Sequence, residues 1–266
     1  MPLTEFQANL ARALSENRSF DSYLAGGAAI LIEPKTTRFS RDLDYFHDSE
    51  ERVVEAFDAD RRLLERRGYS VEVNLNQPGY IRAVVARERE ATKVEWAQDS
   101  AWRFMPTMKD ERVGWVLHPV DLAVNKVLAL AGREEPRDLL DVLYIHEHVL
   151  VLGALCWAAC GKDPGFTPLS LLELLRRRGQ LRGEDLDRLD LAEPLELPLL
   201  KKSWLQALDS VKAFVASRPS PEVGCLYYSA AEHAFVDPGA VDPAFATEVR
   251  PHFGRPGGVL PRVADS

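Results

Sequence analysis

Two aspartates one residue apart form the segment of the chain best suited to chemistry. Asp42 and Asp44 flank Leu43 and are followed by Tyr45 and Phe46. Aromatic and apolar residues of this kind favour a β-strand. Side chains alternate between the two faces of a strand, so we expect both carboxylates on one face. Carboxylates this close repel each other unless a cation relieves the charge. Mg²⁺ suits the pair, because it takes hard oxygen ligands and often bridges carboxylates to substrate phosphates.

A third acid and a glycine pair extend this hypothesis. Phosphoryl and nucleotidyl transfer depend on metal ions that neutralise the phosphate chain and hold the reacting oxygens in line. Glu95 lies in a strand-like segment, residues 92–97, and we expect it to complete the metal site. Gly26 and Gly27 precede an apolar run, and their backbone N–H groups are expected to face a triphosphate. Simpler interpretations stay open: a surface turn or helix cap for the aspartates, a turn for the glycines, and an exposed strand position for Glu95.

A second group of charged residues lies further along the chain. Lys126 is followed after ten residues by Arg137, Asp138 and, three positions later, Asp141. Asp138 and Asp141 are expected to share one face of a helix. Each residue also has a structural interpretation: Arg137 can pair with Asp141, Asp138 can favour the helix dipole, and Lys126 can extend along an apolar stripe.

The period of the apolar residues predicts an α/β (α+β) protein with a mixed sheet flanked by helices, followed by a helical C-terminal domain. The spacing predicts helices at 3–17, 22–32 and 49–67, strands at 41–47, 92–97 and 113–117, and a hairpin over 71–85. Further helices are expected at 119–131, 136–150 and through 151–215. We expect a core at 1–117, a helical domain at 118–216, and an irregular tail rich in Pro and Gly at 217–266.

Composition limits the class of protein. The chain has 266 residues, 46% apolar and 28% charged, with a net charge of −8, which argues mildly against extensive nonspecific binding of nucleic acid. No apolar run approaches about 18 residues and no secretion signal opens the chain, so we expect no membrane contact and a cytoplasmic location. Cys156, Cys160 and Cys225 are too few for a disulfide framework and fit a reducing compartment. Their spacing, with His146 and His148, does not match a zinc site, so we expect buried cysteines.

Taken together, the two groups of residues resemble the AbiEii/AbiGii type of abortive-infection toxin, a branch of the nucleotidyltransferases built on the DNA polymerase β-like core. The first block is Gly-Gly-Ala-Ala at residues 26–29 followed by Arg-Phe-Ser-Arg-Asp-Leu-Asp-Tyr-Phe at residues 38–46. The second is Lys126 followed by Arg137-Asp138-x-x-Asp141, with arginine where the family has a second lysine. The wider superfamily usually has serine at the position of Ala28.

The resemblance implies transfer of a nucleoside monophosphate from an NTP, with Mg²⁺ or Mn²⁺, to an acceptor such as the acceptor end of tRNA. It also implies a toxin with a cognate antitoxin. The residues and the resemblance together give the full set of expected roles. The expected catalytic residues are Asp42, Asp44, Glu95 and Lys126, the metal ligands Asp42, Asp44 and Glu95, the nucleotide-binding residues Gly26, Gly27, Arg38, Ser40, Lys126 and Arg137, and the supporting acids Asp138 and Asp141. Two alternatives remain open: an acceptor that is a small molecule or protein, and a degenerate nucleotide-binding module, which Ala28 favours.

Overall fold

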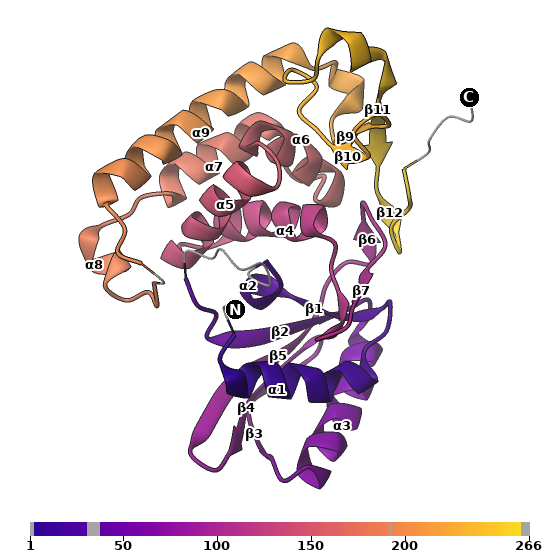
Figure 1. Cartoon of the computed structure of the whole chain (residues 1–266), viewed down its shortest axis with the longest axis vertical. Helices are drawn as coiled ribbons and strands as arrows, with labels where there is room; N and C mark the ends of the chain where they lie inside the picture. The colour runs from indigo at the N-terminus through magenta and orange to yellow at the C-terminus, as the bar shows by residue number, and fades with distance from the viewer. Residues whose placement is uncertain (1–2, 31–37, 192, 262–266) are drawn as a thin grey trace. The chain divides into compact units, whose positions relative to one another are not determined.

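The computed structural model describes residues 3–30, 38–191 and 193–261 of the chain. These residues form two compact units (Figure 1). The first unit is Met1–His118 together with the short returning segment Pro256–Gly258, and the second is Pro119–Arg255 with Val259–Ser266. A mixed α/β unit is thus followed by a largely helical one, which confirms the predicted fold class.

A mixed sheet is the centre of the first unit. Within the described residues it has seven strands in the order β3-β4-β5-β2-β1-β8-β7. Their bounds are β1 (Ser22–Ala25), β2 (Asp42–His47), β3 (Ser70–Gln77), β4 (Tyr80–Arg87), β5 (Glu90–Gln98), β7 (Met108–Asp110) and β8 (Gly114–Val116). Strand β2 is parallel to β5 and antiparallel to β1, so it lies in the middle of the sheet. The short β6 (Trp102–Arg103) pairs with β12 (Arg255–Pro256).

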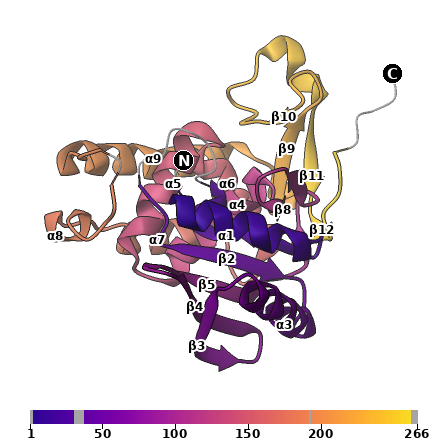
Figure 2. The ribbon, with the colours of Figure 1, turned by 60° about the horizontal axis from the view of Figure 1, so that its bottom comes forward.

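Two helices cover one face of this sheet, α1 (Glu5–Leu14) and α3 (Glu50–Arg66), and both are drawn in Figures 1 and 2. Thr4 caps α1 in a capping box with Gln7, and Ser49 caps α3, as its place before the apolar stripe predicts. The rings of Phe57 on α3 and Trp96 on β5 meet edge to face at 5.1 Å. Helix α2 (Gly26–Ile30) packs against β2 and β1.

The second unit is built around a helix that is buried on all sides. This is α6 (Leu152–Lys162), in which every residue from Leu152 to Cys160 is buried. The other helices are α4 (Pro119–Gly132), α5 (Pro136–His148), α7 (Pro168–Arg178), α8 (Gly183–Leu186) and α9 (Leu197–Ser217). Short 3₁₀ helices occupy Ser15–Asn17 in the first unit and Ser220–Glu222 and Pro243–Glu248 in the second. The cysteines are free and buried, as expected.

The structure corrects three expectations about local structure. Residues 22–25 form strand β1 rather than the start of a helix, and strands β6 and β7 were not expected. The tail, expected to be mostly irregular, contains a sheet that was not expected: β9 (Cys225–Ser229), β10 (Ala234–Phe235) and β11 (Val249–Phe253) form a three-stranded antiparallel sheet within the described residues. Strand β9 is buried against α6, and this burial outweighs the high content of proline and glycine around it.

In the part of the chain that the structure describes, no single helix is long and apolar enough to cross a bilayer, and α5 and α6 pass that test only together, across a bend of 113°.

Candidate active site

Strands β2 and β5 bring three carboxylates together on one face of the sheet. Asp42 and Asp44 lie two residues apart on β2, and Glu95 lies on β5 in register with Asp44. One oxygen from each of the three carboxylates lies within 4.8 Å of the others. Asp42 is buried, whereas Asp44 and Glu95 are half-buried. The sequence therefore placed these three side chains correctly on one face.

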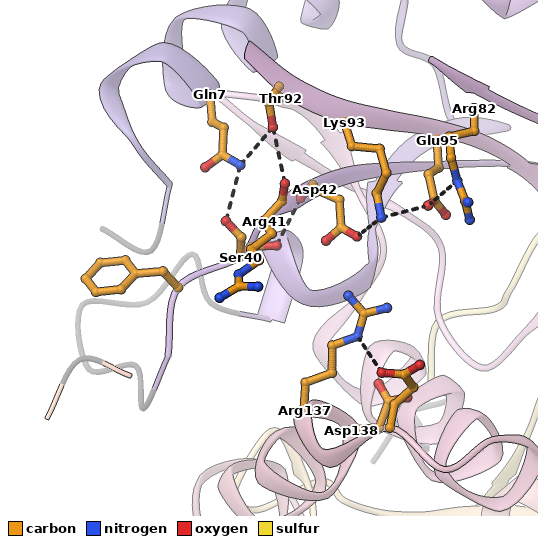
Figure 3. A network of polar contacts seen from close by, with 12 residues as sticks. Gln7, Ser40, Arg41, Asp42, Arg82, Thr92, Lys93, Glu95, Arg137 and Asp138 are labelled. Atoms are coloured by element: carbon orange, nitrogen blue, oxygen red, sulfur yellow. Dashed lines mark hydrogen bonds and ion pairs between the residues drawn. The ribbon is translucent and has the colours of Figure 1, made fainter. Parts of the chain in front are cut away.

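Basic side chains from β5 and β4 contact two members of this carboxylate cluster of Asp42, Asp44 and Glu95, namely Asp42 and Glu95 (Figure 3). Lys93 lies beside Asp42 in the strand register, and its Nζ is 2.9 Å from Asp42 Oδ2 and 3.3 Å from Glu95 Oε1. Arg82, on β4, donates from Nε to Glu95 Oε1 at 3.0 Å. Burial lowers the pKa of Lys93, but Asp42 and Glu95 raise it by more, so the pKa lies above its usual value.

Gly26 lies directly beside Asp44, one member of the cluster. It has a φ of +63°, and a Cβ added there would lie 1.9 Å from Asp44 Oδ2. Glycine is therefore needed at this position for two reasons: it adopts the left-handed backbone conformation, and it leaves the space that Asp44 occupies. Gly27, the next residue, lies under the guanidinium of Arg38, whose Nη2 would be 2.9 Å from an added Cβ. The two glycines thus leave room for two different side chains, Gly26 for Asp44 and Gly27 for the buried Arg38.

The residues before β2 are fixed by side chains from two other elements. Gln7 on α1 donates from Nε2 to the carbonyl of Ser40 at 3.2 Å and to Thr92 Oγ1 at 3.1 Å (Figure 3). Ser40 in turn donates from its hydroxyl to the carbonyl of Asp42 at 2.9 Å. These bonds set the direction in which the chain enters β2. They give the buried Ser40 a structural role, and its contact with a nucleotide stays a prediction.

A buried ion pair supports the sheet from the opposite face. Arg18 Nη2 donates to both oxygens of Asp60, and the two side chains are fully buried. Trp96 donates from Nε1 to Asp60 Oδ2 at 2.7 Å, and the Arg18 guanidinium lies 4.5 Å from the centre of the Tyr45 ring. Trp96 and Tyr45 are neighbours of Glu95 and Asp44 along the chain. This network fixes the strands that present the carboxylates, and nothing in the local sequence pattern indicates it.

The second group of predicted residues meets within the second unit. Lys126 on α4 is buried, and its Nζ lies 3.1 Å from Asp138 Oδ1 and 2.8 Å from Asp141 Oδ2 on α5. Arg133 donates from Nε to Asp138 Oδ2 at 2.6 Å. Burial raises the pKa of Asp138, but Lys126 and Arg133 outweigh it, so the pKa lies below its usual value.

The spacing of Lys126 and the two acids thus has a structural consequence, because it joins α4 to α5 through a buried ion-pair network. Arg137, also on α5, has its Nε 4.0 Å from Glu135 Oε2. The roles expected for Lys126 and Arg137 in contacting phosphate remain predictions.

Sequence reasoning missed Lys93 and Arg82 as parts of the first site. The signal for Lys93 was present, because alternation along β5 places Lys93 and Glu95 on the same face. The contact of Arg82 depends on its pairing opposite Glu95 across β4 and β5, which alternation alone does not give.

A scan against protein-family models gives one match over most of the chain. Residues 10–224 match the model described as "Nucleotidyl transferase AbiEii toxin, Type IV TA system". The chain belongs to the AbiEii toxin family. This AbiEii family member is therefore an enzyme, a nucleotidyltransferase toxin. The match includes the carboxylate cluster on β2 and β5 as well as Lys126, Asp138 and Asp141.

The fold is shared with a solved structure at low sequence identity. MenT4, a nucleotidyltransferase toxin from Mycobacterium tuberculosis H37Rv, is 17% identical with a TM-score of 0.54, over 81% of this chain and 83% of that chain. JHP933 from Helicobacter pylori is 18% identical with a TM-score of 0.47, over 81% of this chain and 97% of that chain. A search of curated proteins finds no match.

The donor chemistry of the carboxylate cluster fits a divalent cation. Its three side chains all offer hard oxygen ligands, which Mg²⁺ and Mn²⁺ prefer. The same oxygens of Asp42 and Glu95 already bind one cationic group, the ammonium of Lys93. A position that attracts a positive charge is thus present in the geometry of this chain.

Proposed function

We propose that this AbiEii family member transfers a nucleoside monophosphate from an NTP to RNA, at an end such as the acceptor end of tRNA, with Mg²⁺ or Mn²⁺ held by Asp42, Asp44 and Glu95. We propose further that it acts as the toxin of a pair and is neutralised by a cognate antitoxin. The family description supports the toxin role. The choice of RNA rests on what the resemblance to the family implies about the acceptor. Lys126 is proposed to contact phosphate, with Asp138 and Asp141 supporting it.

One observation carries the proposal: the gathering of three carboxylates beside the backbone of Gly26. Three acids that approach each other within 4.8 Å are costly unless a cation offsets their charge. Gly26 leaves the Asp44 carboxylate in contact with the backbone, at the start of the segment expected to bind the triphosphate. Acids and glycine together form the kind of site that nucleotidyl transfer needs.

In the proposed reaction an acceptor hydroxyl oxygen bonds to the α-phosphorus of the NTP. The bond from that phosphorus to the oxygen bridging to the β-phosphate breaks, pyrophosphate leaves, and the hydroxyl proton passes to solvent or a nearby carboxylate. A divalent ion, when bound, offsets the charge that develops on the phosphate oxygens. Asp42, Asp44 and Glu95 hold their oxygens in a fixed arrangement, and Arg82 keeps Glu95 oriented. Gly26 leaves room for the Asp44 carboxylate.

The test is label transfer with matched variants. Purified protein is incubated with each α-³²P-labelled NTP, Mg²⁺ or Mn²⁺, and total RNA, with parallel reactions that lack RNA or contain EDTA. Asp44→Asn is expected to lower incorporation into RNA by at least about 100-fold, because it removes charge from the reacting centre. Asp58→Asn on α3 is the control, since Asp58 is exposed and lies outside the carboxylate cluster.

Each result discriminates between the candidate functions. Label in RNA that is lost with Asp44→Asn and with EDTA, but kept with Asp58→Asn, supports the proposal. If the label appears on the protein or on a small molecule instead, the acceptor is that protein or small molecule and not RNA. Bound NTP without any transfer supports a degenerate nucleotide-binding module. Full activity in Asp44→Asn means that the carboxylate cluster is not the site.

A further inference from the structure

Lys93 reaches into the carboxylate cluster from one of the strands that build it. It lies on β5 two residues before Glu95 and opposite Asp42 in the parallel register. Its ammonium lies 2.9 Å from Asp42 Oδ2 and 3.3 Å from Glu95 Oε1 (Figure 3). The ammonium therefore bridges two of the three acids proposed to bind metal.

A divalent ion and this ammonium compete for the same space. Mg²⁺ binds oxygen at about 2.0–2.1 Å, so an ion that contacts both Asp42 and Glu95 has to lie between their carboxylates. The Lys93 Nζ already lies there, at hydrogen-bonding distance from both. Two positive centres this close also repel each other. Binding of the metal through these same two oxygens is thus incompatible with retention of both lysine contacts.

The lysine side chain has a way out of the cluster. About 34% of it is exposed, so it can rotate towards solvent without any change in the backbone. Glu95 keeps its other partner when the lysine leaves, because Arg82 on β4 also donates to Glu95 Oε1. Loss of the Lys93 contacts therefore need not disturb the orientation of Glu95.

We infer that Lys93 is the counter-ion of the metal-free site, and that a divalent metal binds by displacing its ammonium from Asp42 and Glu95. This inference rests on the proposed function, since it takes the carboxylate cluster to be the metal site. It gives Lys93 two effects. The lysine offsets the mutual repulsion of the acids before metal binds, and it lowers the affinity for metal by occupying the site.

Mn²⁺ binding to the full-length protein, followed by isothermal titration calorimetry, tests this without any activity assay. Lys93→Met keeps the length of the side chain but removes its charge, and we expect it to tighten Mn²⁺ binding at least about tenfold. Lys93→Arg keeps the charge, so its affinity should stay within about threefold of the wild type. Lys109→Met is the matched control. Lys109 lies on β7 over the Trp115 ring, so its replacement removes the same charge from a different strand.

The outcomes separate this inference from the proposed function. If the wild-type protein and every variant fail to bind Mn²⁺, the metal site itself is wrong. If the wild type binds Mn²⁺, Asp44→Asn abolishes the binding, and Lys93→Met binds no more tightly than the wild type, only the role of Lys93 is wrong. If Lys109→Met tightens Mn²⁺ binding as much as Lys93→Met does, the role of Lys93 is also overturned, because the gain in affinity then depends on the net charge of the protein and not on Lys93.

A second measurement avoids any dependence on how well Lys93→Met folds. In a crystal structure of the wild-type protein with Mn²⁺, we expect the Lys93 Nζ to lie more than about 4 Å from both Asp42 and Glu95, beyond the range of an ion pair. Retention of both contacts beside a bound ion overturns the inference.

Discussion

Replacing Gly26 by alanine tests how closely the backbone fits the carboxylate cluster. The added Cβ would lie 1.9 Å from Asp44 Oδ2, whereas ordinary contact begins at 3.4 Å, so that oxygen has to move by about 1.5 Å. The Cβ of Asp44 itself would be 2.7 Å away, which means that rotation of the side chain alone does not relieve the clash. Strand β2 and the glycine backbone therefore have to separate.

The expected loss of function follows from this displacement. Metal sites tolerate ligand shifts of only about 0.2 Å, and a misplacement of about 1 Å at a reacting centre can cost about 100-fold in rate. We expect Gly26→Ala to lower nucleotide transfer by at least about 100-fold and to weaken Mn²⁺ binding. We also expect a loss in the free energy of unfolding of about 2–5 kcal/mol, the sum of left-handed backbone strain and overpacking.

Gly68 provides a matched control for the stability lost to left-handed backbone strain alone. Its φ is +79°, close to the +63° of Gly26, but an added Cβ would meet nothing within 4 Å. Gly68→Ala should therefore lose only about 1–2 kcal/mol of stability and keep full transfer activity and Mn²⁺ affinity. Urea unfolding, calorimetry with Mn²⁺ and label transfer measure the three quantities. A folded Gly26→Ala protein that binds Mn²⁺ and transfers label as well as Gly68→Ala would refute the reasoning.

The remaining predictions concern buried charges. Lys126→Met should lower the free energy of unfolding by on the order of 3 kcal/mol, because it takes the ammonium from two buried carboxylates. Adding Asp141→Asn should restore part of that loss in urea unfolding, and no recovery would contradict the ion pair. Burial, with Arg18 and Arg52, lowers the pKa of His47 from 6.5 to about 2, so below pH 6.5 the unfolded chain takes up a proton that the folded chain excludes. The free energy of unfolding should therefore fall by about 2 kcal/mol between about pH 7 and pH 5 because of His47 alone. In His47→Leu, the fall measured over the same pH range should be smaller by that amount.

The sequence was informative where alternation and helix capping decide the structure. The order Asp-Leu-Asp-Tyr-Phe places Asp42 and Asp44 on one face and Tyr45 on the other, and β2 has this arrangement. The same reasoning placed Glu95 correctly, because β5 also alternates. Helix α3 begins after Ser49, as its capping residue predicts.

Features that depend on pairing between distant segments were not predictable. The register of β2 with β5 sets Lys93 beside Asp42, and a single strand pattern contains no information on register. Gly26 approaches Asp44 because β1 ends just before it and runs antiparallel to β2, whereas the apolar run suggested only a helix. In the tail, the prolines and glycines on either side of the strand Cys225–Ser229 indicated irregular structure, so the strand was not predicted.

The most direct test of the central claim is an anomalous diffraction map of crystals grown with Mn²⁺ and a non-hydrolysable NTP. The account predicts a manganese peak about 2.0–2.5 Å from oxygens of Asp42 and Asp44, with Glu95 in the same coordination shell and the triphosphate beside Gly26. A bound nucleotide with no manganese at these carboxylates, or with manganese at another site, would contradict it.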